Sequence, residues 1–283
     1  MDNERINLAI EAAFVADTYA LGAHWIYDGK ELGALDIDWE ELSAPKARAH
    51  WHKNKLKGDF THYGDQGKWL YDFVQENNRF DIRMYRNYWL DKINHYEGYI
   101  DASSRETVEA LAQNPEAIAG SASTELSIIG RIAPLLLVSS KRDEFLDHVL
   151  SFVALTHNSP RVLSAAALFA SILVDVIEGK SITDALADAE VIPTLQEAFD
   201  AGLKSKHQDS FRTIRQFGPA CGIEGAFEGV VHLLCSYDDF KEAIMANVKS
   251  GGDSAARGMV VGMIMGAAGK KIPHTWKVGM TGF

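Results

Sequence analysis

The chain has 283 residues, a formal net charge of −11 and a hydrophobic fraction of 47%. This length and composition predict one large packed domain, or two smaller ones, and exclude a disordered chain. The acidic balance, with no run rich in Lys and Arg, excludes nucleic acid and anionic membrane surfaces as expected partners. The N-terminus lacks the basic start of a signal peptide, and Cys221 and Cys235 make no disulfide framework, so a cytoplasmic location is expected.

Apolar residues recur with helical spacing along most of the chain, and no run alternates strictly between apolar and polar residues. We therefore expect an all-α protein. The longest apolar stretch, Val162 to Val174, is shorter than a bilayer span, so no membrane helix is expected. No linker divides the chain, which predicts a single domain over residues 1–283. The predicted helices cover residues 5–23, 66–77, 81–97, 104–112, 124–138, 142–156, 160–178, 181–187, 193–203, 222–235, 238–248 and 254–268.

The first predicted helix carries Asp17 on a face that is otherwise apolar or small and that also holds His24. A carboxylate that is buried without a partner is costly. Asp17 therefore needs a neighbouring helix, a ligand or water, and the sequence leaves the structural and the functional interpretation open. The next turn gathers His24, Tyr27 and Asp28 with further aromatic rings, which makes it a candidate cleft wall, although such rings also pack cores.

A polar segment ending in Thr61, His62, Tyr63, Asp65 and Gln66 resembles a loop that enters a helix. Helix N-termini readily hold anions and hydroxyl groups. If the helix begins near His62, then His62, Asp65 and Gln66 share one face. Capping by Thr61 or Asp65 beside a surface histidine is the alternative. So many polar side chains without apolar spacing favour a functional role.

Two further segments could carry chemistry. Thr156 and His157 close one predicted helix, where a charged histidine is favoured and a capping histidine is the simpler explanation. Glu224 stands between glycines and apolar residues, three positions after Cys221. That pattern is compatible with a general acid/base or a nucleophile, although Cys221 is more simply a small buried hydrophobe.

The last predicted helix begins with a tight turn at Gly251-Gly252 and a strong capping residue, Asp253. Ser254, Gly258, Gly262 and Gly266 then recur every four residues and form a stripe without bulky side chains. Glycine costs about 1 kcal/mol per position in a helix relative to alanine. The stripe therefore predicts that another helix or a ligand approaches closely, and Asp253 at its head could face a ligand.

These segments, in this order, resemble the ADP-ribosylglycohydrolase (DraG-like) family over nearly the whole chain. The resemblance implies an all-α, single compact bundle of many helices around a cleft. It also implies hydrolysis of the bond between ADP-ribose and an acceptor with two magnesium ions. The segments that carry it are Asp17 with Ala20-Leu21-Gly22-Ala23, Gly130-Arg131-Ile132-Ala133-Pro134-Leu135, Thr156-His157, and the tail from Gly251 through Ile272-Pro273 to Trp276.

The chain departs from the family at the metal positions. The family's Thr-Asp-Asp cluster corresponds to Thr61-His62-Tyr63, or, shifted, to Tyr63-Gly64-Asp65, and its Asp-x-Asp-Thr cluster to Asp253-Ser254-Ala255-Ala256. Only Asp253 and Asp65 remain as candidate metal-binding carboxylates. Magnesium requires hard oxygen ligands in octahedral geometry, so we expect no two-magnesium site. The replacement segments resemble the crystallin J1-related branch of the family.

We hypothesise a diverged hydrolase or lyase that acts on a glycosidic or related C–N or C–O bond of a small polar or nucleotide-like substrate. Its candidate catalytic residues are Glu224, Asp17 and Asp65, and turnover should vanish when Glu224 and Asp17 become amides. The alternatives are an inactive protein that binds ADP-ribose or a similar ligand and a purely structural, crystallin-like role. Candidate substrate-binding residues are His24, Tyr27, Asp28, Thr61, His62, Tyr63, Gln66, Asp101, Thr156, His157, Cys221, Ser254 and Arg257.

Overall fold

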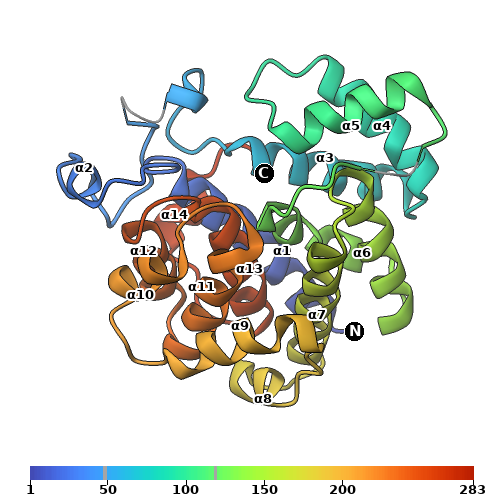
Figure 1. The fold of residues 1–283 in the computed structure, drawn as a ribbon. Coiled ribbons are helices and arrows are strands. Elements are labelled where there is room, and N and C mark those ends of the chain that lie inside the picture. The colour runs from blue at the N-terminus through green and yellow to red at the C-terminus, as the bar shows by residue number, and fades with distance from the viewer. Residues whose placement is uncertain (47–49, 118–119) are drawn as a thin grey trace.

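The computed structural model describes residues 1–46, 50–117 and 120–283. Within these ranges the elements are α-helices and short 3-10 helices, without strands, so the all-α prediction is confirmed. Figure 1 shows α1 running through the middle of the molecule, with α3, α4 and α5 above it and α9 to α12 on one side. The helices are α1 Asn3–Ala20, α2 Gly29–Gly33, η1 His50–His52, α3 His62–Asn77, α4 Ile82–Asn94, α5 Ala102–Gln113, η2 Leu126–Arg131, η3 Ala133–Val138, α6 Arg142–Thr156, α7 Pro160–Ile177, α8 Ile182–Ala187, α9 Pro193–Lys204, α10 Ser210–Phe217, α11 Ile223–Ser236, α12 Phe240–Lys249, α13 Ser254–Ala267 and α14 His274–Gly279.

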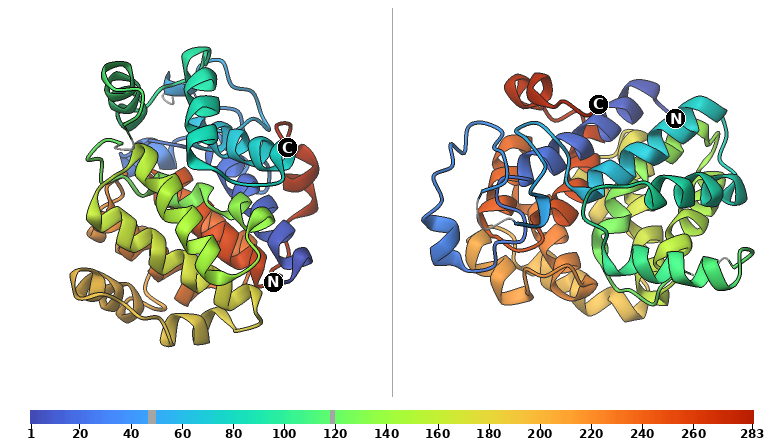
Figure 2. Two further views of the ribbon diagram at one scale, coloured as in Figure 1. Left: turned by 90° about the vertical axis from the view of Figure 1, so that its right-hand side faces the viewer. Right: turned by 90° about the horizontal axis from the view of Figure 1, so that it is seen from above.

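The core is built around the contact between α1 and α13, which lie near opposite ends of the sequence. Every residue of α13 is buried, and Figure 2 shows this helix enclosed by its neighbours. A Cβ atom added at Gly262 would lie 2.6 Å from the carbonyl oxygen of Ala12, and one added at Gly266 would collide with Leu8. The glycine stripe therefore lets the two backbones approach, as its spacing predicted.

Helix α7 is long and apolar enough, by length and composition alone, to cross a membrane. This helix extends beyond Val162 and Val174 at both ends, so the prediction that the longest apolar segment is too short to span a bilayer was wrong. Within the fold, 61% of this helix is buried, and Phe169 and Val174 have no exposed surface. Its place in the core explains its apolar composition.

The predicted helix over residues 124–138 was wrong in type, because the structure has two 3-10 helices there, η2 and η3. Pro134 near the start of η3 lacks an N–H donor, which prevents one continuous helix. The helix predicted to start at residue 66 begins at His62, because the Thr61 hydroxyl caps it by accepting from the Tyr63 N–H at 3.1 Å. The prediction missed α2, η1, α10 and α14, all of which are short.

Candidate functional site

Asp17 on α1 is hydrogen-bonded to the residue that caps α3. Its Oδ1 accepts from the Thr61 hydroxyl at 2.5 Å, and its Oδ2 accepts from the Thr61 N–H at 2.8 Å. Burial raises the pKa of this fully buried carboxyl to about 7, even though both hydrogen bonds lower it. A Cβ atom at Gly64 would collide with Asp17. Both oxygens of Asp17 are therefore engaged in fixing the start of α3 against α1.

Asp253 is fully buried at the start of α13 and holds Tyr63 from α3. The Tyr63 hydroxyl donates to Asp253 Oδ2 at 2.9 Å, and the Trp25 side chain also hydrogen-bonds to this carboxyl. Asp253 Oδ1 accepts from the Ala256 N–H at 3.2 Å and lies 3.7 Å from His24 Nδ1. Burial raises the pKa of Asp253 despite these donors. The hydrogen bond between Tyr63 and Asp253 joins α3 to α13, and His24 brings the turn after α1 to the same carboxyl.

Arg257 fixes the turn that precedes Asp253. Its fully buried guanidinium donates to Asn247 Oδ1 at 3.0 Å, to the Pro219 carbonyl at 3.0 Å and to the Gly251 carbonyl at 2.6 Å. Burial lowers the pKa of Arg257 to about 10. Because each guanidinium nitrogen donates to the protein, Arg257 holds the turn that shapes the site.

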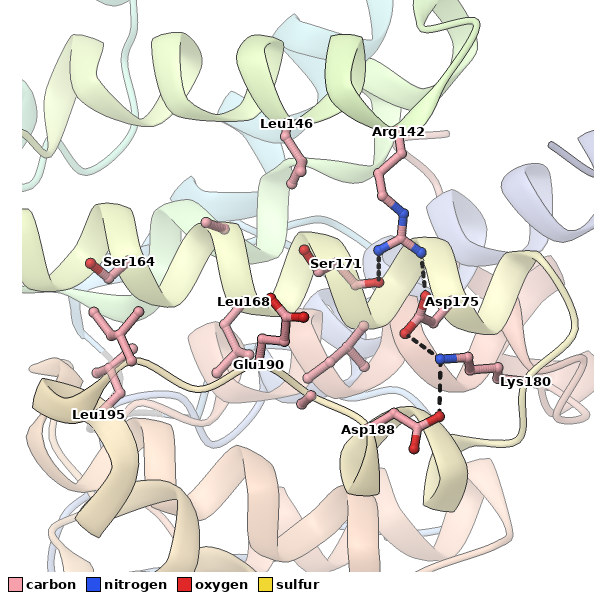
Figure 3. A pocket seen from close by; sticks show the side chains of 14 residues that line it. Arg142, Leu146, Ser164, Leu168, Ser171, Asp175, Lys180, Asp188, Glu190 and Leu195 are labelled. Carbon is pink, nitrogen blue, oxygen red and sulfur yellow. Dashed lines mark hydrogen bonds and ion pairs between the residues drawn. The ribbon is translucent and has the colours of Figure 1, made fainter.

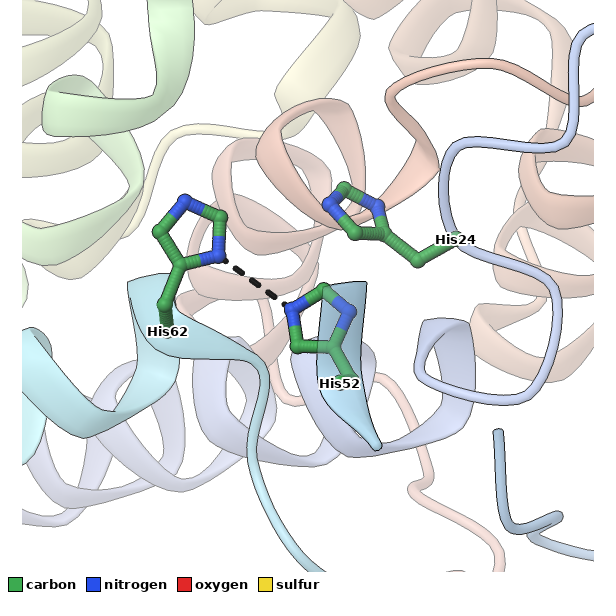
Figure 4. Close-up of side chains that lie close together, drawn as sticks. All are labelled: His24, His52 and His62. Atoms are coloured by element: carbon green, nitrogen blue, oxygen red, sulfur yellow. Dashed lines mark hydrogen bonds between the residues drawn. The ribbon is translucent and has the colours of Figure 1, made fainter. Parts of the chain in front are cut away.

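His24, His52 and His62 form a buried group that we call the histidine cluster (Figure 4). His52 Nε2 and His62 Nδ1 lie 3.3 Å apart. Both ring nitrogens of His24, Nδ1 of His52 and Nε2 of His62 are buried without a hydrogen-bond partner. Burial lowers the pKa of His24 and of His52 to about 3. The sequence analysis missed His52, which lies in an irregular segment without helical spacing.

A polar network on α3, α5 and η2 borders the histidine cluster. The Gln66 amide accepts from Arg131 Nη1 at 2.8 Å and donates to Asp101 Oδ2 at 3.3 Å. Asp101 Oδ1 accepts from the Ser103 hydroxyl at 2.6 Å, and its Oδ2 lies 3.8 Å from His62 Nε2. Burial by itself would raise the pKa of Asp101, but His62, Arg131 and Ser103 together lower it. Asp101 is therefore an anion that faces His62.

Glu125, which the sequence analysis did not single out, lies beside His157 and Cys221. Its Oε2 is 3.7 Å from His157 Nε2, and both atoms are buried without a hydrogen-bond partner. The Cys221 side chain hydrogen-bonds to Glu125, while His157 Nδ1 is hydrogen-bonded to the Thr156 hydroxyl at 2.9 Å. Burial, Asp253 and Glu125 raise the pKa of Cys221 to about 12, so its thiol is not a ready nucleophile.

Tyr27 and Tyr63 are both affected by the charges of Glu125 and Asp253. Burial is the largest cause that raises the pKa values of these tyrosines, and the charges of Asp253 and Glu125 raise them further, as they do for Cys221. Tyr27 is 43% exposed, so this part of the site reaches the surface. The charges of both carboxyls therefore act on the same three side chains.

Three predicted site residues are engaged elsewhere. Asp65 pairs with Lys55 Nζ at 2.5 Å and also accepts from Tyr96. Asp28 is exposed and caps α2 through the Lys30 N–H at 2.6 Å. The Glu224 side chain is 60% exposed and lies 3.4 Å from Arg161.

The side chains around Asp253 do not suit magnesium. Its neighbours are a tyrosine hydroxyl, an indole, an imidazole and the cation of Arg257. Asp65 is paired with Lys55. In the Asp-x-Asp-Thr cluster of the family, the positions of the second Asp and of the Thr correspond to Ala255 and Ala256 in this chain. Two ions that each require several hard oxygen ligands do not fit this set.

A separate surface hollow of about 560 Å³ lies between α6, α7 and the α8–α9 segment (Figure 3). None of the predicted site residues lines it. Arg142 pairs with Asp175, and Lys180 Nζ lies 3.2 Å from Asp175 and 3.1 Å from Asp188. Arg142, Lys180, Asp175 and Asp188 are therefore paired with one another along this hollow.

The fold and the buried polar groups at the starts of α3 and α13 define an all-α domain with one internal candidate site. The family model for ADP-ribosylglycohydrolase matches residues 2–282, and the chain belongs to this family. It is similar to Crystallin J1A and Crystallin J1B of Tripedalia cystophora, with 22% and 23% identity over 96% of this chain and 91% of each relative. A solved structure, an ADP-ribosylglycohydrolase-related protein complex, has a TM-score of 0.78 at 20% identity and covers 99% of this chain and 94% of that one.

Proposed function

We propose that this protein is a hydrolase or lyase that cleaves a glycosidic or related C–N or C–O bond in a small, polar, nucleotide-like molecule without two magnesium ions. One observation carries the proposal. Glu125 Oε2, His157 Nε2 and Ser254 Oγ are buried without hydrogen-bond partners, and the Glu125 and His157 atoms lie 3.7 Å apart. Each unsatisfied buried group costs about 1–3 kcal/mol, which a bound substrate would recover.

Two carboxyls in different environments can divide acid and base roles, as in glycoside hydrolysis. The pKa of Asp253 is raised by burial, so this group suits proton donation to a leaving group. Glu125 is 21% exposed and has a free buried oxygen beside His157, so it suits activation of water or abstraction of a proton. The geometry thus favours Glu125 and Asp253 over Glu224, which is exposed and ion-paired, and Asp17, whose oxygens are both engaged.

The test is turnover of ADP-ribose conjugates, with ADP-ribose joined to an amino-acid side chain, an acyl group or phosphate, in buffer with a magnesium chelator. Glu125→Gln should lower kcat by about 100-fold or more. Glu224→Gln, a matched amide on an exposed glutamate, should stay within a factor of about three. Wild-type turnover that Glu125→Gln leaves unchanged would contradict the proposed role. Circular dichroism confirms that both variants fold.

A second candidate, binding of ADP-ribose or a similar ligand without cleavage, is favoured by the substitution of the family's carboxylates by His62, Tyr63, Ala255 and Ala256. The similarity to two proteins named crystallins also supports it. Thermal stabilisation by ADP-ribose, without product from any conjugate, would select this candidate. We also propose a cytoplasmic location, which the free thiols of Cys221 and Cys235 support.

A further inference from the structure

The histidine cluster brings together three segments that are separate in the sequence. His24 follows α1, His52 ends η1, and His62 is the first residue of α3. One ligand nitrogen from each ring lies within 4.8 Å of the other two. Figure 4 shows the three rings gathered around one space. The exposed fractions of His24, His52 and His62 are 0%, 3% and 0%.

The cluster lacks the hydrogen bonds that buried imidazoles normally make. Its internal contact, between His52 Nε2 and His62 Nδ1, leaves both nitrogens of His24 and one nitrogen of each other ring without a partner. Buried side-chain polar atoms in native proteins are usually satisfied. The ring nitrogens without a partner are therefore available to bind a ligand.

We propose that the histidine cluster binds one zinc-class transition-metal ion through His24, His52 and His62 and keeps its fourth position open. Zinc is bound by imidazole nitrogens at about 2.0–2.1 Å in tetrahedral geometry, which places two ligand nitrogens about 3.4 Å apart. The His52–His62 pair already has this separation, at 3.3 Å. The third ring lies within 4.8 Å, so it closes by at most about 1.4 Å to complete the set. Imidazole ligands select zinc, copper, iron or nickel over magnesium.

The surroundings supply the carboxylates that usually support metal-bound histidines. Asp101 Oδ2 lies 3.8 Å from His62 Nε2, the nitrogen that does not face His52. Asp253 Oδ1 lies 3.7 Å from His24 Nδ1, which leaves Nε2 of His24 to bind the metal. Such carboxylate–histidine–metal arrangements orient the ring and increase its basicity.

A hollow in the surface borders the cluster on the side of His52. This hollow of about 220 Å³ is lined by this histidine and by residues of η1 and of the loop before α5, including Trp51, Lys55 and Tyr99. Three protein ligands and an accessible fourth position are typical of catalytic rather than structural zinc.

The experiment is a titration of chelator-treated protein with Co²⁺, followed by its visible absorption, with Zn²⁺ as competitor. We expect one Co²⁺ per chain with the intense absorption of a four- or five-coordinate ion. Zn²⁺ should displace this ion, whereas excess Mg²⁺ should not. His52→Gln should weaken binding by at least about 100-fold, and Asp101→Asn by about 10- to 100-fold, the usual effect of losing a supporting carboxylate.

Two other histidines serve as matched controls. His95 has a 79% exposed side chain, and His232 is buried and hydrogen-bonded to Ser205 and Ser210. His95→Gln and His232→Gln should bind Co²⁺ like the wild type. His52→Gln is the decisive variant because His52 lies on a short turn, and circular dichroism verifies its fold. No stoichiometric binding by the wild type, or wild-type affinity in His52→Gln, would overturn the proposal.

Discussion

Replacing Asp17 by asparagine should stabilise the protein above pH 7 and leave its stability nearly unchanged at pH 4. Asp17 is fully buried, and burial raises its pKa from 3.8 to about 7. Below pH 3.8 the carboxyl is protonated in both the folded and the unfolded chain. Between these two values only the folded state holds the proton, so the wild type loses stability as the pH rises. Above pH 7 both states are ionised and the loss is complete.

The shift of about three pKa units at 1.36 kcal/mol per unit gives a loss of about 4 kcal/mol between pH 4 and pH 7. Asparagine imitates the neutral carboxyl, because its oxygen can accept from the Thr61 N–H and its NH₂ can donate to the Thr61 hydroxyl oxygen. Asp17→Asn should therefore be more stable than the wild type by about 4 kcal/mol at pH 8. Taking the difference between the two proteins cancels the titration of all other groups.

The assay is urea denaturation at pH 4, 5, 6, 7 and 8, followed by circular dichroism. The control is Asp238→Asn, whose fully exposed side chain lies 3.6 Å from Lys270. Its effect should stay within about 0.5 kcal/mol at every pH. A stability difference between Asp17→Asn and the wild type that does not change with pH would refute the reasoning.

Gly262→Ala should lower the free energy of unfolding in urea by about 1–3 kcal/mol, because its Cβ would meet a backbone oxygen of α1. Gly33→Ala, whose Cβ would have nothing within 4 Å, should be neutral or stabilising. Equal effects of the two substitutions would contradict the close packing of α1 and α13. Arg257→Met should cost about 3–5 kcal/mol, since it leaves Asn247 and the buried Gly251 carbonyl without their donors and removes one of the two donors to the Pro219 carbonyl. A loss below about 1 kcal/mol would be incompatible with that role. In metal-free protein, burial lowers the pKa of folded His52 to about 3. The free energy of unfolding of the wild type should therefore fall by about 1.4 kcal/mol per pH unit below about pH 6.5, and His52→Gln should lack this contribution. Parallel stability curves of the two proteins from pH 7 to pH 4 would disprove it.

Local sequence signals predicted much of the fold. The range 142–156 matches α6, and the predicted starts at Pro160, Pro193 and Ser254 match α7, α9 and α13. Proline at the first turn and an apolar face within one helix suffice for such predictions. The missed helices are short, and three to eight residues hold little periodic signal.

The candidate site was harder to predict because its members meet only through tertiary packing. Thr61, His62, Tyr63 and Asp253 stood out because they cap or begin helices. Glu125 and His52 gave no local signal, since nothing near them in the sequence indicates His157 or His24 as neighbours. The burial of Asp17 was foreseeable from its apolar face, but its partner Thr61 lies on another helix start, and only the fold selects it.

The close approach of α1 and α13 has a consequence for synthesis on the ribosome. Because α1 leaves the ribosome early and α13 almost last, the apolar face of α1 stays without its main partner until nearly the whole chain has emerged. Contacts between such distant segments close late and slow folding. The centre of this protein therefore cannot form until α13 has been synthesised, and the apolar face of α1 is open to aggregation until then.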